Sequence, residues 1–264
     1  MPKFVNVPFL PNGTFSAVPN YQYFMTTKII RANTRGKADF GWLKANFSFS
    51  FGSYYNPEKI QFGMLRVLND DTIAPGAGFG THPHENMEII TIPLEGGLQH
   101  RDSMGNEGVI RFGEVQVMSA GTGVEHSEMN ASRTEIAKTL QLWVFPEKQD
   151  VAPRYDQKAF DLQQNLNRFV TVVTPHDKNE GNALWVYQQT FFSLGIFDAG
   201  TTAKYDVNID GNGLYLFLIE GAVEIDKQPL NERDAAAITA VDSIEITTRT
   251  KSKILLVEVP MTHR

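Results

Sequence analysis

Two short stretches hold the residues whose types and spacing could do chemistry. One contains His82 and His84, and the other contains His126 and Glu128. Residues two apart in a β-strand point to the same face, so each pair would project together. If the two strands face one interior, three imidazoles and one carboxylate converge on one point. Such ligands suit a transition-metal ion, so the pattern predicts a metal site of mixed nitrogen and oxygen type.

The histidines could also be ordinary structural residues that bind no metal. A single buried histidine is more often a core residue, and a His-x-His pair can lie on an exposed strand. Three of the six histidines of the chain fall in the two stretches, which are flanked by glycines. This arrangement favours the metal site and leaves His100, His176 and His263 outside it.

Composition limits the class of protein. The 264 residues suggest one large or two small domains, and a net charge of −6 without a basic block argues against direct binding of nucleic acid. The absence of cysteine excludes disulfides, thiolate ligands and cysteine nucleophiles. No apolar run approaches the roughly 18 residues of a membrane span, and the first ten residues do not resemble a signal peptide. We therefore expect a cytoplasmic protein without membrane contact.

Most of the chain has the pattern of short β-strands separated by glycine turns. Such spacing favours a sandwich or barrel over alternating strands and helices. One exception is Gln157–Leu166, for which we expect a short helix. Strands are predicted, among other places, at Thr27–Ile30, Asn46–Phe51, Gly63–Leu68, Glu88–Leu94, Val115–Ser119 and Thr139–Phe145.

A weak internal repeat indicates two copies of one barrel. Leu94-Glu95-Gly96 in the first half corresponds to Ile219-Glu220-Gly221 in the second, and an apolar strand follows each after a hairpin. The second copy lacks histidines at the corresponding places, so one metal site per chain is expected. The predicted domains are an N-terminal extension over 1–25, a metal-binding barrel over 26–146, and a barrel lacking metal ligands over 147–264.

The chain resembles a known superfamily around these histidines. Gly76-(x5)-His82-x-His84-(x3)-Glu88 resembles the first motif of the cupins, and Gly113-(x12)-His126 resembles the second. The longer gap after Glu88, and Glu128 two residues beyond His126, are similar to the pirin family of two-barrel cupins. Further segments also resemble bacterial pirins, among them Arg66-Val67-Leu68-Asn69-Asp70-Asp71, Asp102-Ser103-Met104-Gly105-Asn106 and Met118-Ser119-Ala120-Gly121-Thr122-Gly123.

The resemblance covers about Thr26 to Pro153 strongly and the remainder more loosely. It implies an all-β bicupin, with two tandem antiparallel β-barrels of the jelly-roll type in one chain. Because paired barrels imitate a cupin dimer, we expect a monomer.

The resemblance also implies the ligands of the ion. His82, His84, His126 and Glu128 would bind one divalent metal, most often Fe(II) in this family. Glu88 would not bind it, and we expect its carboxylate to accept a hydrogen bond from a ligating imidazole. Affinities for divalent ions follow the same order at almost any such site, so the sequence does not choose between iron and other transition metals.

Bacterial pirin relatives resemble quercetin 2,3-dioxygenases. By that resemblance a flavonol would bind through its 3-hydroxyl and 4-carbonyl groups, and Glu128 would be ligand and general base. Dioxygen would open the ring with release of carbon monoxide. Two interpretations stay open for Phe47, Phe49 and Trp143: they line the site as apolar walls for a flat substrate, or they belong to the core, as aromatic stripes in a barrel more often do.

Two other functions stay open. The first is a non-enzymatic iron-binding redox sensor or co-regulator that acts through protein partners, as eukaryotic pirins are described. The second is a cupin isomerase or sugar-binding module that needs no metal redox chemistry.

Overall fold

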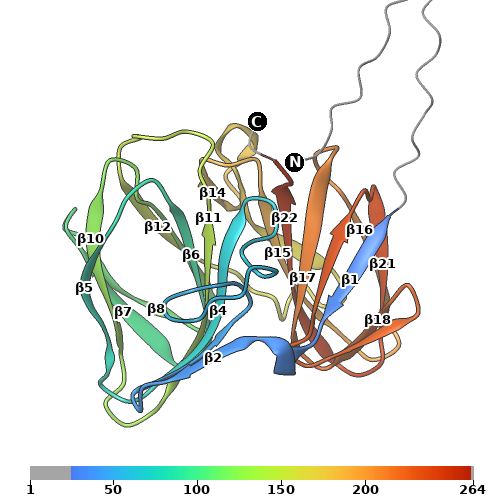
Figure 1. Cartoon of the computed structure of the whole chain (residues 1–264), viewed down its shortest axis with the longest axis horizontal. Coiled ribbons are helices and arrows are strands. Elements are labelled where there is room, and N and C mark those ends of the chain that lie inside the picture. The colour runs from blue at the N-terminus through green and yellow to red at the C-terminus, as the bar shows by residue number, and fades with distance from the viewer. Residues whose placement is uncertain (1–24, 263–264) are drawn as a thin grey trace, which may run out of the picture.

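The computed structural model describes residues 25–262, in which the regular structure is almost entirely β (Figure 1). No α-helix occurs in this range, and two 3-10 turns, η1 (Ala32–Thr34) and η2 (His176–Lys178), are the helical elements there. The described range also holds no helix long and apolar enough to cross a bilayer.

The first half of the molecule consists of a seven-stranded and a four-stranded sheet. The long sheet has the order β12-β9-β6-β11-β4-β3-β2, and the short sheet has the order β5-β10-β7-β8. Their strands are β2 (Gly36–Asp39), β3 (Leu43–Phe47), β4 (Leu65–Ile73), β5 (Gly78–His84), β6 (Glu88–Glu95), β7 (Gly97–Asp102), β8 (Glu107–Arg111), β9 (Glu114–Ser119), β10 (Val124–Asn130), β11 (Ala137–Val144) and β12 (Arg154–Ala159).

The second half repeats this plan. Its long sheet has the order β1-β20-β17-β22-β15-β13-β14, and its short sheet has the order β16-β21-β18-β19. Their strands are β1 (Thr26–Ile30), β13 (Phe169–Pro175), β14 (Leu184–Val186), β15 (Phe191–Phe197), β16 (Thr202–Asp206), β17 (Asn212–Glu220), β18 (Ala222–Ile225), β19 (Gln228–Asn231), β20 (Ala235–Thr239), β21 (Ser243–Thr248) and β22 (Ser252–Pro260).

Each half is therefore a jelly-roll-like sandwich, and the predicted all-β bicupin architecture is confirmed. The sheets do not close into complete barrels. Strand pairs are antiparallel apart from β13 and β14, which run parallel.

The largest apolar core lies between the two long sheets. Side chains of the first half, such as Leu68, Leu140 and Leu142, pack in one cluster with Phe217 and Leu255 of the second. Successive residues of a strand face opposite sides, so Gln141 and Trp143 point into the first sandwich instead. The long sheet of the first half thus separates this shared core from the interior that contains the histidines.

The interior of the second sandwich is apolar. Its buried cluster includes Phe197, Leu214, Leu216, Ile244 and Ile246, contributed by strands of both sheets. A polar exception is Glu258 on β22, whose carboxylate accepts a hydrogen bond from Tyr205 of this cluster.

Two strands lie in the sheet of the opposite half. β1 pairs with β20, where Thr26 faces Thr239, and β12 pairs with β9, where Arg154 faces Ser119. In Figure 1 the blue β1 accordingly lies among the orange and red strands. The domain limits 26–146 and 147–264 stay a prediction, and the 1–25 extension lies outside the described residues except for Met25.

Two local predictions are wrong. The expected helix over Gln157–Leu166 is replaced by the end of β12 and a turn, because the backbone of Arg154–Ala159 pairs with β9. The expected strand over Asn46–Phe51 ends at Phe47, after which the chain turns. The strand β12 forms because it pairs with β9, and the local periodicity of Gln157–Leu166 carries no signal of that pairing.

Candidate metal centre

The three clustered histidines come from two adjacent strands of the short sheet. His126 on β10 lies directly opposite His82 on β5, and His84 follows two residues later on the same face of β5. β5 is an edge strand, which is why Pro83 between the histidines is tolerated although it cannot donate a backbone hydrogen bond.

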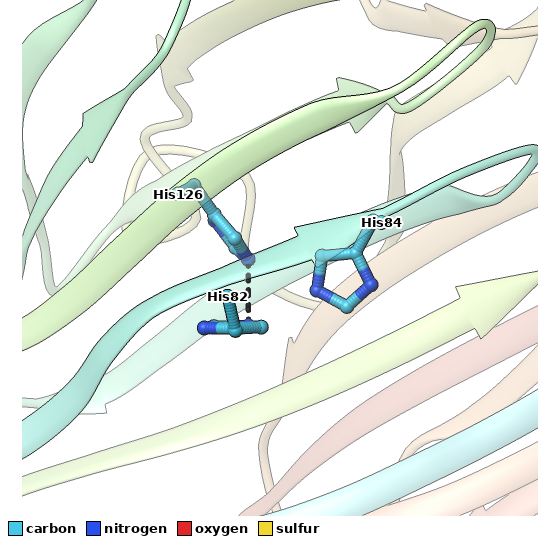
Figure 2. A group of neighbouring side chains, drawn as sticks. All are labelled: His82, His84 and His126. Carbon is cyan, nitrogen blue, oxygen red and sulfur yellow. Dashed lines mark hydrogen bonds between the residues drawn. The ribbon is translucent and has the colours of Figure 1, made fainter.

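The three imidazoles converge on one point, whereas the carboxylate of Glu128, which we expected with them, is not a member of this cluster. One ring nitrogen from each residue lies within 4.8 Å of the others, and this is the only group of three or more metal-capable side chains found in residues 25–262. Ring centroids are 4.5 Å apart for His82 and His126, and 4.9 Å apart for His84 and His126. Figure 2 shows the rings of His82 and His84 projecting from β5 toward that of His126.

The surroundings of these imidazoles favour the neutral form with a free lone pair, which can bind a cation. His82 Nδ1 lies 2.8 Å from the carbonyl oxygen of Gly80, so Nδ1 donates and Nε2 keeps its lone pair. Burial, followed by the neighbouring His82, lowers the pKa of His84 to about 4 and that of His126 to about 3. Both rings are neutral at neutral pH, which is the form that binds a metal.

The donor set fits a transition-metal ion. The Nε2 atoms of His82 and His126 are 3.0 Å apart. Two nitrogens bound at right angles to one ion, each at about 2.1 Å, lie about 3.0 Å from each other. These two side chains therefore already stand at a separation that suits two ligands of one ion.

Glu128 lies two residues beyond His126 on β10 and is almost completely buried. The register shifts between the two residues, so Glu128 faces Phe79 instead of Gly80. Its Oε2 accepts a 2.6 Å hydrogen bond from Gln141 Nε2, and its Oε1 accepts a 3.3 Å bond from Thr91 Oγ1. Burial raises the pKa of Glu128, and the bond from Gln141 opposes that shift in part.

Sequence reasoning missed Gln141 and Thr91 as partners of Glu128. The alternation in β11 does place Gln141 on the face opposite Leu140 and Leu142, and that signal could have identified it as an inward residue. Thr91 gave no comparable signal, because β6 is buried on both faces and its sequence is nearly all apolar.

A pocket of about 290 Å³ opens onto the centre. Phe47, Phe79 and Trp143 form apolar walls, beside His82, His84, Glu128 and Gln141. Of the three aromatic residues considered from the sequence, Phe47 and Trp143 line this pocket. Phe49 does not, because β3 has ended and its ring packs 5.5 Å from that of Tyr215 in the core between the halves.

Polar residues of β4 also line this pocket. Asn69 and Asp71 lie beyond the predicted strand Gly63–Leu68, but they belong to β4 and are buried. Burial, with nearby Asp70 and Glu128, raises the pKa of Asp71 to about 8. Charged residues in a row resemble a turn in the sequence, which is why the strand was not predicted here.

His100 and Glu88 lie outside the histidine cluster. His100 Nε2 is 3.1 Å from Asp102 Oδ2, and its ring stacks on that of Tyr155. Glu88 does not reach an imidazole, contrary to expectation. Its side chain lies on the opposite face of the long sheet, where Ser119 Oγ donates a 2.7 Å hydrogen bond to its Oε2.

Two family models match this chain. Residues 29–144 match the model described as Pirin, and residues 171–259 match the model described as quercetinase C-terminal cupin domain. The two matches fall on the two sandwiches.

Similar proteins agree with these models. Quercetin 2,3-dioxygenase of Escherichia coli K12 is 39% identical over 230 residues, which cover 87% of this chain and 97% of the relative. A pirin-like protein of Caulobacter vibrioides is 40% identical over 223 residues, covering 84% and 95% of the two chains. The crystal structure of YhhW from E. coli superposes with a TM-score of 0.85 at 37% identity, covering 90% of this chain and 100% of that one. A second structure, of bacterial pirin YhhW in complex with nickel(II), gives a TM-score of 0.83 at 36% identity, with 89% and 99% covered.

Proposed function

Because the chain belongs to the pirin family of two-domain cupins, we propose that it is a metal-dependent dioxygenase that opens the ring of a quercetin-type flavonol. In this proposal His82, His84, His126 and Glu128 hold one divalent ion. The observation that carries it is the histidine cluster, of which His82 and His84 line an apolar pocket. The nickel complex of a similar pirin and the dioxygenase name of the E. coli relative support it.

We propose Fe(II) as the ion. When bound, it supplies Lewis acidity toward the oxygens of the substrate and redox chemistry toward dioxygen. The chain contributes three neutral imidazoles and one carboxylate, which leave the ion a net positive charge and favour an anionic oxygen of the substrate.

Glu128 is proposed as the general base. Its carboxylate is buried in the wall of the pocket, where it receives the 3-hydroxyl proton of the flavonol. Gln141 and Thr91 hold the two oxygens in place, so the carboxylate does not have to reorient during the transfer.

The pocket walls position the substrate and exclude water. Phe47, Phe79 and Trp143 offer flat apolar surfaces on which an aromatic ring can stack. The volume of about 290 Å³ is close to the lower end of the range for pockets that hold small molecules, which is about 300 Å³. A compact planar substrate is therefore favoured over a bulky one.

Substitution of the proposed ligands tests this function. His82→Ala and His126→Ala should lose most of the metal and the activity, whereas Glu128→Gln should keep more metal and lose turnover. His100→Gln is the matched control and should keep its metal content, because His100 lies outside the cluster. Equal turnover of Glu128→Gln and wild type at equal metal content would remove the proposed role of Glu128 as the base.

A further inference from the structure

A second cavity lies between the two halves, apart from the histidine pocket. It has a volume of about 420 Å³ and shares no lining residue with that pocket. Its walls come from both long sheets and from the segment after β12, and they are mainly apolar: Ile92, Phe112, Phe160, Leu162, Leu194 and Ile196.

Two cations line this apolar cavity, the exposed Arg111 and the buried Lys253. Lys253 lies on the interior strand β22, is only 8% exposed and lines the cavity. Its Nζ lies 4.4 Å from the centroid of the Phe112 ring, which is 56% exposed at the rim. Within residues 25–262 it forms no hydrogen bond or ion pair with a carboxylate. Glu220, opposite it on β17, acts on it only at longer range.

Glu258 is the other buried charged residue of β22, and its surroundings differ from those of Lys253. Glu258 accepts five hydrogen bonds, two of them from backbone amides and three from the side chains of Tyr205, Asn208 and Asn212. Buried charges are normally paired in this way, since an unpaired one is costly. Burial accordingly lowers the pKa of Lys253, and a bound anion would stabilise its charged form.

The acidic residues at the cavity already have partners. Glu114 Oε2 accepts hydrogen bonds from the backbone nitrogen of Arg111 and from Gln157. Asp161 Oδ1 accepts hydrogen bonds from the backbone nitrogens of Gln163 and Gln164. Neither carboxylate forms an ion pair with Lys253 within residues 25–262, so the ammonium group can meet the anionic group of a ligand. The first 24 residues of the chain contain no Asp or Glu, so this segment cannot supply the anion.

From this combination we infer that the cavity between the halves is a second ligand site, which binds a small aromatic carboxylate with its anionic group on Lys253. The apolar walls take the ring, and Phe112 covers both the ring and the Lys253 ammonium group. The volume of about 420 Å³ falls within the range of pockets that hold small ligands, about 300–1,000 Å³.

Titration calorimetry of the full-length protein with 1-naphthoate tests the site. Wild type should bind it, and Lys253→Met, which keeps the length of the side chain without its charge, should bind at least about tenfold more weakly. Neutral 1-naphthamide should bind both proteins alike. Lys204→Met, which removes an exposed charge on β16, is the matched control and should bind naphthoate like wild type.

Crystals of wild type grown with 4-iodobenzoate locate the ligand independently of any variant. Iodine in the cavity beside Lys253 supports the site, even if Lys253→Met fails to fold. Iodine confined to the histidine pocket, or equal naphthoate affinity of folded Lys253→Met and wild type, would overturn it. Neither result bears on the dioxygenase proposal, because the two pockets share no residue.

Discussion

Three buried carboxyl groups of the first half have raised pKa values, and the groups around each decide its task. Glu128 and Asp71 line the histidine pocket, and Glu88 faces the second half. The residue type is nearly the same in all three cases. Each residue lies on a particular face of its strand and meets different hydrogen-bond donors there. These surroundings distinguish Glu128, the proposed base, from Glu88, a structural group.

At the residue scale, Gln141→Leu tests the support of Glu128. Loss of the 2.6 Å bond to Oε2 removes an interaction that favours the ionised carboxylate, so the pKa of Glu128 should rise further. We expect turnover to fall about tenfold, with the acidic limb of the rate profile moved to higher pH, in steady-state assays. Gln99→Leu, on the exposed side of β7, should change neither. An acidic limb at the wild-type position would show that Gln141 does not tune this group.

Glu88 gives a second prediction at this scale. Burial raises its pKa to about 7, above the value of 4.5 expected in the unfolded chain. Between these values the folded protein binds the extra proton, so the free energy of unfolding should fall as the pH rises through this window, by up to about 3 kcal/mol. Urea unfolding of the metal-free protein at several pH values measures this. Glu88→Gln should flatten the slope, and an unchanged slope would contradict the assignment.

At the element scale, the packing of β5 against β10 sets the separation of the histidines. A Cβ atom at Gly78 would lie 2.3 Å from the carbonyl oxygen of Glu128, whereas one at Gly80 would meet nothing within 4 Å. The two glycines of one strand therefore offer a matched pair of substitutions.

Gly78→Ala should push β5 away from β10 and spread the cluster. We expect a loss of about 1–3 kcal/mol in stability and weaker binding of Ni(II), measured by thermal unfolding and by equilibrium dialysis. Gly80→Ala should retain both properties. If Gly78→Ala binds metal as well as Gly80→Ala does, then this strand contact does not position the histidines.

Local patterns account for what the sequence predicted well at this scale. The same-face placement of His82 with His84 follows from strand alternation alone, and so does that of His126 with Glu128. The repeat is also confirmed, since β6 and β17 each end at a glutamate followed by a glycine with positive φ, Gly96 and Gly221.

Non-local pairing accounts for what was missed. Asp71 reaches the pocket because β4 lies between β3 and β11, and Lys253 faces a cavity made by both halves. The sequence carries no local signal for such neighbours. The strand β12 was missed for the same reason, because only its pairing with β9 distinguishes it from a helix.

At the scale of the whole molecule, a buried ion network joins the halves. Asp70 on β4 binds Arg35 at 3.1 Å and Arg233 of the second half at 3.4 Å, and all three side chains are less than 20% exposed. Arg35 also lies over the ring of Phe217. Together with the exchanged strands β1 and β12, this network opposes separation of the two sandwiches.

Asp70→Asn should therefore destabilise the molecule as a whole. Two buried guanidinium groups would lose their carboxylate, which costs about 3–5 kcal/mol for a buried pair broken on one side. Chemical unfolding should show a lower midpoint, and the two halves should begin to unfold separately. Asp206→Asn, which breaks an exposed pair with Lys204, should shift the midpoint little. A similar midpoint for both variants would mean that the network does not hold the halves together.

The most direct measurement is oxygen uptake with quercetin by protein reconstituted anaerobically with Fe(II), with bound metal determined on the same sample. We predict uptake in proportion to bound metal, release of carbon monoxide, and no uptake by His126→Ala. Full metal occupancy without oxygen uptake would contradict the dioxygenase proposal. That result would favour the alternative function, an iron-dependent sensor that acts through protein partners.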